Sequence, residues 1–297
     1  MTSSFILLSS ILTLLSGFLL AVKFSHQINL KQTMYKKLVS WWLILVSILL
    51  AGQCELGLPT LIALTISCCI YELSVITQQK KSIGLYLMML MIFVIQYSIY
   101  NALWLVAIIS LLVICGLFYA LRYEDKNNHL VFVLASLICI LGLSMTSLIL
   151  VLSSGHPLEG AMGNLLFLVF ISQGNDVAQY GWGTSIGKRK IAPKISPNKT
   201  WAGFIGGLIT FTFVGYWLGV KLTNMSHLQS ACAAAIICTL GFLGDLLVSY
   251  LKRYYKIKDT GNMLPGHGGM GDRVDSLLLS GLGFLLYLLA FTNNSFY

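Results

Sequence analysis

The sequence predicts an all-α, polytopic integral membrane protein with about nine or ten transmembrane helices. Hydrophobic residues make up 57% of the 297 residues, charged residues only 10%, and the mean hydropathy is +0.83. A soluble domain needs a more polar surface than this composition can provide. The apolar segments are also about as long as a bilayer-spanning helix. Since they leave no room for a separate soluble domain, we expect a single integral unit.

Ten apolar segments are the candidate helices. Residues 1–150 contain about six of them, and residues 151–297 contain the others together with two polar motifs. The second, third and fourth segments are short or crowd their neighbours, so nine spans result if one of them is re-entrant. The segments lie near residues 4–22, 38–54, 58–77, 84–100, 102–121, 130–152, 161–180, 201–220, 229–250 and 275–292.

The cations predict the orientation of the chain. If all ten segments span the bilayer, 18 of the 19 Lys and Arg residues fall on one side, and Lys221 falls on the other. The positive-inside rule makes the cation-rich side cytoplasmic, and we expect the chain in the inner (plasma) membrane. The same rule accounts for the net charge of +9, because the cations are spread over short loops. We therefore expect no nucleic-acid partner.

The C-terminal motif, residues 249–275, contains eight of the 29 charged residues of the chain. A helix that runs into this motif places Asp245, Ser249, Lys252 and Arg253 on one face, at i, i+4, i+7 and i+8. This face carries a carboxylate, a hydroxyl and two cations. Such a combination can bind a metal ion and phosphate groups.

The second half of the C-terminal motif is rich in glycine. Pro265 and the glycines between residues 266 and 269 interrupt a helix and allow backbone N–H groups to approach a phosphate closely. Asp272 and Asp275 then begin a new helix at i and i+3, with Arg273 between them. Carboxylate oxygens are ligands that Mg²⁺ prefers, so this half adds metal-binding capacity to the first.

The central motif consists of Asn175-Asp176 and the segment 187–203. Asp176 lies near the end of an apolar helix, where a carboxylate is costly and usually functional. Five cations follow between residues 188 and 199, and Pro193 and Pro197 favour a stiff loop over a helix. A stiff basic loop suits a triphosphate. A solvated loop that only sets topology would explain the charges but not the order of the letters SPNKT.

Both motifs resemble those of the phosphatidate cytidylyltransferases, also called CDP-diacylglycerol synthases. The resemblance covers roughly residues 160–290. The chain departs from it at Ala202, where many members carry a glutamate, and this leaves the role of that position open. The matching positions of the C-terminal motif are Ser249, Lys252-Arg253, Lys258-Asp259, Gly261, Leu264-Pro265, His267-Gly268-Gly269, Asp272-Arg273 and Asp275.

The resemblance implies an enzyme that uses CTP and phosphatidate, with its active-site cavity at the cytoplasmic face. It implies Mg²⁺ bound by Asp245 and Asp272, and it suggests a second, monovalent or divalent, cation and a homodimer. Residues 151–297 are then the catalytic region. The implied catalytic residues are Asp245, Lys252, Arg253, Asp272 and Asp275. The implied substrate-binding residues are Asp176, Lys188, Lys194, Ser196, Lys199, Thr200, Ser249, Lys258, Asp259, His267, Gly268, Gly269 and Arg273.

Two other functions fit part of the pattern. An ion-coupled transporter also places carboxylates such as Asp176 and Asp245 in apolar helices. Carriers keep these groups near the bilayer midplane, however, whereas here the polar residues gather at one face. A CTP-dependent enzyme with another lipid acceptor would share every motif. The product distinguishes these alternatives, since a transporter consumes no CTP.

One acidic residue, Glu72, lies outside both motifs but at the same predicted face. It is close to the cytoplasmic end of the segment 58–77. Two interpretations stay open at this point. Glu72 reaches the cavity in the first, and in the second it is a surface carboxylate that extends toward water.

Overall fold

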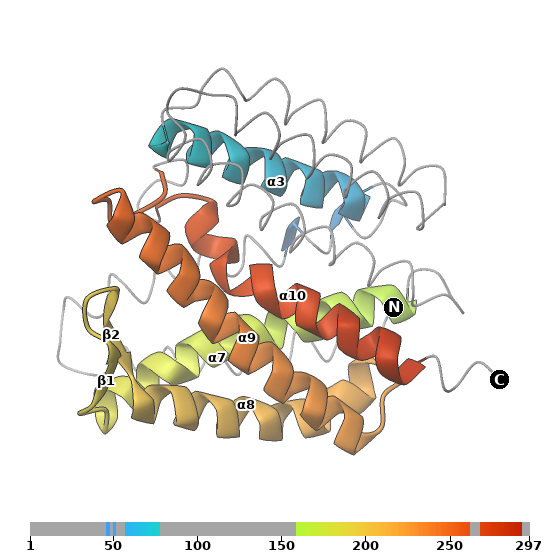
Figure 1. Cartoon of the computed structure of the whole chain (residues 1–297). Coiled ribbons are helices and arrows are strands. Elements are labelled where there is room, and N and C mark those ends of the chain that lie inside the picture. The colour runs from blue at the N-terminus through green and yellow to red at the C-terminus, as the bar shows by residue number, and fades with distance from the viewer. Residues whose placement is uncertain (1–45, 48–49, 52–56, 78–158, 262–267, 293–297) are drawn as a thin grey trace.

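The computed structural model describes residues 46–47, 50–51, 57–77, 159–261 and 268–292, which are mainly helical (Figure 1). Its long helices coincide with predicted apolar segments, which confirms that part of the prediction. Four predicted segments lie outside the described residues, namely those near 4–22, 84–100, 102–121 and 130–152, and so does most of the segment near 38–54. The count of spans therefore stays a prediction. The elements are α3 (Gly57–Ile76), α7 (Glu159–Ser185), β1 (Lys190–Ala192), β2 (Ser196–Thr200), α8 (Trp201–Leu222), α9 (His227–Tyr254) and α10 (Gly271–Thr292).

Three of the described helices are long and apolar enough to cross a bilayer, namely α8, α9 and α10 through Phe291. On α8, large apolar side chains recur at every fourth residue and are exposed, as expected for a face that contacts lipid. Tryptophans stand near both ends of this face, where aromatic residues anchor a helix at the interface. The exposed side chains are Trp201, Ile205, Ile209, Phe213 and Trp217. The sequence and the structure therefore agree on a membrane protein.

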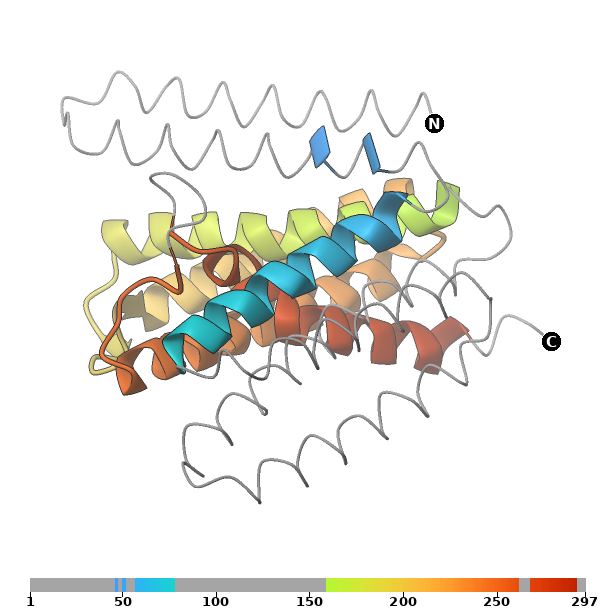
Figure 2. The same ribbon diagram turned by 90° about the horizontal axis from the view of Figure 1, so that it is seen from above.

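The order of the helices brings four helix termini to one end of the bundle. Helices α7, α8, α9 and α10 pack against their neighbours in antiparallel succession (Figures 1 and 2). The C-termini of α7 and α9 therefore lie at the same end as the N-termini of α8 and α10. We call this the charged end, because it carries ten of the eleven Lys and Arg residues in the described part of the chain. Lys221 lies at the other end.

The all-α prediction is wrong for residues 190–200, which form an antiparallel hairpin of β1 and β2. The turn has Pro193 at its second position, where the fixed φ of proline suits a β-turn, and the Ile195 N–H donates to the Ala192 carbonyl at 3.1 Å. The prolines do exclude a helix, as expected, but they also permit a tight turn between two short strands. The hairpin ends in Thr200, whose hydroxyl accepts from the Gly203 N–H and caps α8.

Small residues allow α8 and α9 to approach closely. A side chain at Gly215 would overlap the Ala234 methyl group, and one at Gly219 would overlap the Ser230 side chain. Helices in a bilayer associate largely through such close packing, because lipid provides no hydrophobic drive between them. These glycines therefore help to set the distance between two of the helices that end at the charged end.

We predict that Gly215→Ala lowers the thermal stability of the detergent-purified chain. The added methyl group overlaps Ala234, and overpacking of this kind costs about 1–3 kcal/mol. The matched control is Gly181→Ala on α7, where nothing lies within 4 Å of the added methyl group. A Gly215→Ala variant that unfolds at the same temperature as the control would contradict the proposed close contact.

Candidate functional site

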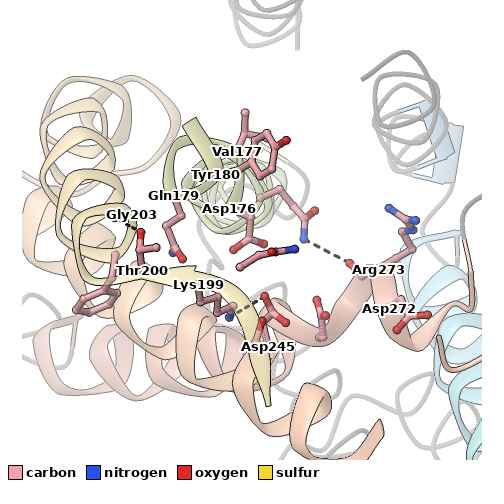
Figure 3. A pocket seen from close by; sticks show the side chains of 15 residues that line it. Asp176, Val177, Gln179, Tyr180, Lys199, Thr200, Gly203, Asp245, Asp272 and Arg273 are labelled. Carbon is pink, nitrogen blue, oxygen red and sulfur yellow. Dashed lines mark hydrogen bonds and ion pairs between the residues drawn. The ribbon is translucent and has the colours of Figure 1, made fainter. Parts of the chain in front are cut away.

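A polar pocket of about 340 Å³ opens at the charged end, between α7, the hairpin, α9 and α10 (Figure 3). Its volume lies near the lower limit for small-molecule sites, roughly 300–1,000 Å³. Each of the converging elements contributes polar groups. The lining residues are Gln173, Asp176, Val177, Gln179, Tyr180, Ser196, Asn198, Lys199, Thr200, Gly203, Phe204, Asp245, Asp272, Arg273 and Asp275.

Lys199 joins the hairpin to α9 within this pocket. Its Nζ lies 2.8 Å from Oδ2 of Asp245, donates to the Phe242 carbonyl at 3.3 Å, and stands 4.3 Å from the centroid of the Phe242 ring. The other oxygen of Asp245 accepts from the Ser249 hydroxyl at 3.2 Å. Asp245 and Ser249 thus lie on one face of α9, as predicted, and a cation from the central motif contacts this face.

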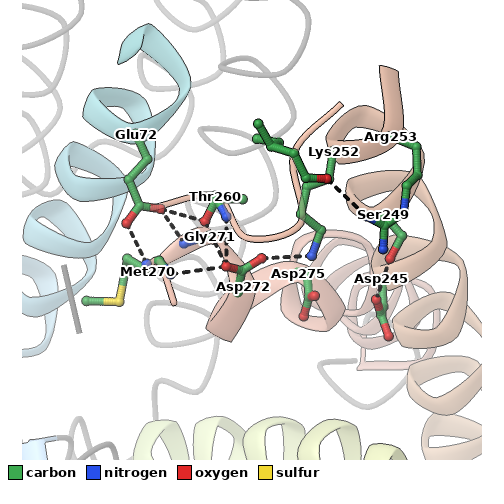
Figure 4. Close-up of polar contacts among 12 residues, drawn as sticks. Glu72, Asp245, Ser249, Lys252, Arg253, Thr260, Met270, Gly271, Asp272 and Asp275 are labelled. Atoms are coloured by element: carbon green, nitrogen blue, oxygen red, sulfur yellow. Dashed lines mark hydrogen bonds and ion pairs between the residues drawn. The ribbon is translucent and has the colours of Figure 1, made fainter. Parts of the chain in front are cut away.

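Asp272 makes several contacts with donors from three parts of the chain (Figure 4). Its Oδ1 lies 2.8 Å from Nζ of Lys252, and its Oδ2 accepts from the backbone N–H groups of Thr260 at 2.8 Å and Gly269 at 3.1 Å. Both oxygens are therefore engaged by protein donors. Asp272 links α9 and α10 and also organises the chain on either side of residues 262–267.

Among the described residues that line the pocket, negatively charged side chains outnumber positively charged ones. Four carboxylates line it, against the two cations Lys199 and Arg273. Asp275 lies within electrostatic range of the negative charges of Asp245 and Asp176, and the Lys252 ammonium partly offsets their effect. Like charges gathered in a partly desolvated site repel one another, and a bound cation relieves this repulsion.

The donor chemistry of the pocket fits Mg²⁺, which prefers carboxylate oxygens. Within the described residues, no three His, Cys, Asp or Glu side chains are close enough together to form a complete metal cage. A complete cage is not required, because Mg²⁺ at phosphate-transfer sites is commonly bound by one or two carboxylates together with water and substrate phosphates. Of the two predicted ligands, Asp245 is the more accessible, with a side chain 26% exposed against 10% for Asp272.

The structure brings most of the predicted site residues together. Ser249 and Lys252 contact lining carboxylates, and Gly268 and Gly269 lie beside Asp272. The predicted residues that line the pocket are Asp176, Ser196, Lys199, Thr200, Asp245, Asp272, Arg273 and Asp275. His267 lies outside the described residues, and Ala202 lies in the first turn of α8.

Five predicted residues lie at the charged end but outside the pocket, with exposed side chains. They are Lys188, Lys194, Arg253, Lys258 and Asp259. Arg253 makes structural contacts, since its guanidinium donates to the carbonyls of Ile195 at 3.2 Å and Ile257 at 3.0 Å. It therefore fastens the tip of the hairpin to the end of α9. The catalytic role predicted for Arg253 stays a prediction.

Sequence reasoning missed several polar residues of the site. Gln173 and Gln179 line the pocket from α7, and Asn198 lines it from β2. A signal was present on α7, because Gln173, Asp176 and Tyr180 recur at i, i+3 and i+7 and so share one face of an otherwise apolar helix. The amide of Gln173 also reaches α10, where it donates to the Ser276 hydroxyl at 3.1 Å.

Neither interpretation of Glu72 is correct. The residue is 3% exposed, so it is not a surface carboxylate, and it does not line the polar pocket. Instead it accepts hydrogen bonds from Thr260 and from the start of α10. The apolar helix around it carries no signal of this distant contact, which is why the sequence alone could not reveal it.

These features define the class of the protein: it is a helical membrane protein with a carboxylate-rich pocket at the charged end of its helices. Residues 35–291 match the model of the cytidylyltransferase family. The match covers most of the chain, so the chain belongs to that family.

Individual relatives agree with this membership. The phosphatidate cytidylyltransferase of Rickettsia bellii (strain RML369-C) is 32% identical over 215 residues, which cover 69% of this chain and 91% of that protein. The one from Bacillus subtilis (strain 168) is 44% identical over 116 residues, or 39% of this chain and 43% of that protein. A protein of Escherichia coli (strain K12) named as uncharacterized protein YnbB is 40% identical over 149 residues, and the match spans half of each chain.

Proposed function

We propose that this chain transfers the cytidylyl group of CTP to phosphatidate, giving CDP-diacylglycerol and pyrophosphate, as a step of phospholipid biosynthesis. One observation carries the proposal: the four carboxylates, Lys199 and Arg273 share a single pocket at the charged end of apolar helices. That arrangement suits a reaction between two polyanions, one of them a lipid. Family membership and the names of the relatives support the same reaction.

The chemistry requires alignment and charge neutralisation rather than a strong base. A phosphate oxygen of phosphatidate, already ionised near neutral pH, forms a bond to the α-phosphorus of CTP. The bond from that phosphorus to the bridging oxygen of the β-phosphate breaks, and pyrophosphate leaves with the electron pair. Since the two substrates repel each other, positioning and electrostatic stabilisation dominate the rate acceleration.

The pocket residues divide this work. In this proposal Lys199 and Arg273 bind phosphate oxygens, while Lys252 keeps the Asp272 carboxylate in position. Asp245 and Asp272 would hold Mg²⁺, with Asp275 close to them. When bound, Mg²⁺ supplies neutralisation of the phosphate charge and of the charge that develops on pyrophosphate. The hairpin, which carries Lys199, serves as the predicted triphosphate-binding segment.

The helices account for the lipid substrate. The diacyl chains can stay in the bilayer beside apolar faces such as that of α8, while the head group enters the pocket at the charged end. We infer that this end faces the cytoplasm of the cell, because it carries nearly all the described cations and because CTP is found there. The proposed location is therefore the inner (plasma) membrane with the active site inward.

The decisive experiment measures pyrophosphate release by the detergent-purified full chain, with CTP, Mg²⁺ and phosphatidate each omitted in turn. We expect release only when all three are present. If another lipid replaces phosphatidate and phosphatidate itself is inert, the acceptor assignment is wrong and the nucleotide assignment stands. A protein that consumes no CTP with any lipid would contradict the proposed function and favour a transporter.

Removal of the pocket cation should impair turnover strongly. We predict that Lys199→Met lowers kcat by about 100-fold, because one charge-stabilising donor is worth roughly 2–4 kcal/mol in a transition state. The matched control is Lys190→Met, which changes an exposed cation of the same hairpin outside the pocket. Equal activity of the two variants would contradict a role of Lys199 in stabilising the transition state.

Removal of the accessible carboxylate should impair metal use. We predict that Asp245→Asn abolishes Mg²⁺-dependent turnover and weakens Mn²⁺ binding, followed by electron paramagnetic resonance, while the protein elutes normally in size-exclusion chromatography. This variant is a cleaner test than Asp272→Asn, because Asp272 also binds the Thr260 and Gly269 backbone. Unchanged Mn²⁺ binding would exclude Asp245 as a ligand.

A further inference from the structure

Glu72, the only charged residue of α3, makes three hydrogen bonds to the region that precedes and begins α10 (Figure 4). Its Oε1 accepts from the Met270 N–H at 2.7 Å, and its Oε2 accepts from the Gly271 N–H at 3.0 Å and from the Thr260 hydroxyl at 2.8 Å. Residues nearly 200 positions apart are therefore joined by one carboxylate. Glu72 therefore connects α3 to Thr260 and to the start of α10.

The position of this carboxylate has an electrostatic reason. A carboxylate buried in an apolar helix is costly unless donors surround it. The first N–H groups of a helix have no partner within the helix, and the helix dipole makes that end partly positive. Glu72 meets both needs at once, since it satisfies the N–H groups at the start of α10 and is itself stabilised by the dipole.

Thr260 extends the contact toward the pocket. Its hydroxyl oxygen lies 2.8 Å from Oε2 of Glu72 and 3.2 Å from Oδ2 of Asp272. A hydroxyl carries one hydrogen and can donate to only one of the two carboxylates at a time. The shorter distance favours Glu72, which leaves Asp272 to bind the Thr260 and Gly269 N–H groups and Lys252.

Glycines make room for this contact. A side chain at Gly269 would overlap Glu72 and Thr260, and one at Gly261 would approach Oε1 of Glu72 to 2.8 Å. The absence of side chains at Gly261 and Gly269 therefore allows the carboxylate of Glu72 to lie against the backbone. The contact with Glu72 on α3, rather than a contact with phosphate, thus explains why these two positions of the C-terminal motif are glycine.

We propose that Glu72 is a positioning residue of the active site. It fixes Thr260 and the start of α10, and thereby the placement of Asp272 and Arg273 relative to Lys252. It acts through these residues, because it does not line the polar pocket itself. The effect on turnover rests on the proposed function, whereas the effect on the backbone of residues 268–273 does not.

The experiment compares Glu72→Gln and Thr260→Val with Thr260→Ser, which keeps the hydroxyl. Thr65→Val is the matched control on α3, since the Thr65 hydroxyl donates only to the Leu61 carbonyl of its own helix, at 2.8 Å. Two quantities are measured on the full chain in detergent. One is hydrogen exchange of the amides in residues 268–273, and the other is kcat and KM for CTP in pyrophosphate release.

We expect Glu72→Gln to speed hydrogen exchange of the amides in residues 268–273 by about tenfold or more. In glutamine an NH₂ group replaces one carboxylate oxygen, so a hydrogen-bond donor of the side chain faces a donor of the neighbouring chain. We expect kcat to fall by about tenfold to 100-fold while KM for CTP changes less than about threefold, as for lost positioning. Thr260→Val should show a smaller change of the same kind. Thr260→Ser and Thr65→Val should match the wild type.

Several results would overturn the proposal. If hydrogen exchange and kcat of Glu72→Gln stay within twofold of the wild type, the contact of Glu72 is not formed in the active protein. Faster exchange with normal kcat would make Glu72 structural only, and a raised KM with normal kcat would assign it to substrate binding. If Glu72→Gln does not fold, identical behaviour of Thr260→Val and Thr260→Ser overturns the proposal. A wild type without pyrophosphate release contradicts the proposed function, and the exchange data still test the contact.

Discussion

The ion pair between Lys252 and Asp272 is the interaction on which the charged end depends. It joins the end of α9 to the start of α10 at 2.8 Å, with both side chains largely withdrawn from solvent. A pair of this kind offsets its desolvation only when further hydrogen bonds complete it, and here Thr260 and Gly269 provide them. Loss of either partner would leave a buried charge, and loss of Asp272 would also release the backbone of Thr260 and Gly269, which it binds.

Two carboxylates of the pocket serve different purposes because their partners differ. Asp272 is bonded on both oxygens to groups of the protein, whereas Asp245 is more accessible and is paired with a cation that comes from the hairpin. A ligand can therefore compete for Asp245, with displacement of Lys199, more readily than for Asp272. The prediction that both hold the same metal ion assigns them equal roles. Their surroundings differ, however, because Asp245 is more accessible to a ligand and Asp272 holds the neighbouring backbone in place.

Sequence patterns predicted the described helices well because apolar length is a local property that the bilayer imposes. The spacing of Asp245, Ser249, Lys252 and Arg253 likewise predicted one face of α9. Ser249 and Lys252 do contact pocket carboxylates, whereas Arg253 is exposed and binds the hairpin. The hairpin was missed because proline at a turn and proline in a stiff loop look alike in one sequence. The contacts of Glu72 were missed because its three donors lie nearly 200 residues away and two of them are backbone N–H groups, which the sequence of α3 does not indicate.

The excess of carboxylates over cations gives the pocket a further property. In the proposed function, a divalent cation bound among these carboxylates neutralises part of their charge and makes the pocket more attractive to a triphosphate. Nucleotide and metal binding should thus be coupled, each strengthening the other by the same factor. In the proposed function Lys199 faces the substrate, and the same side chain fastens the hairpin to Asp245. When phosphates or metal draw one partner away from the other, the hairpin loses a contact with α9, while Arg253 continues to bind the Ile195 carbonyl.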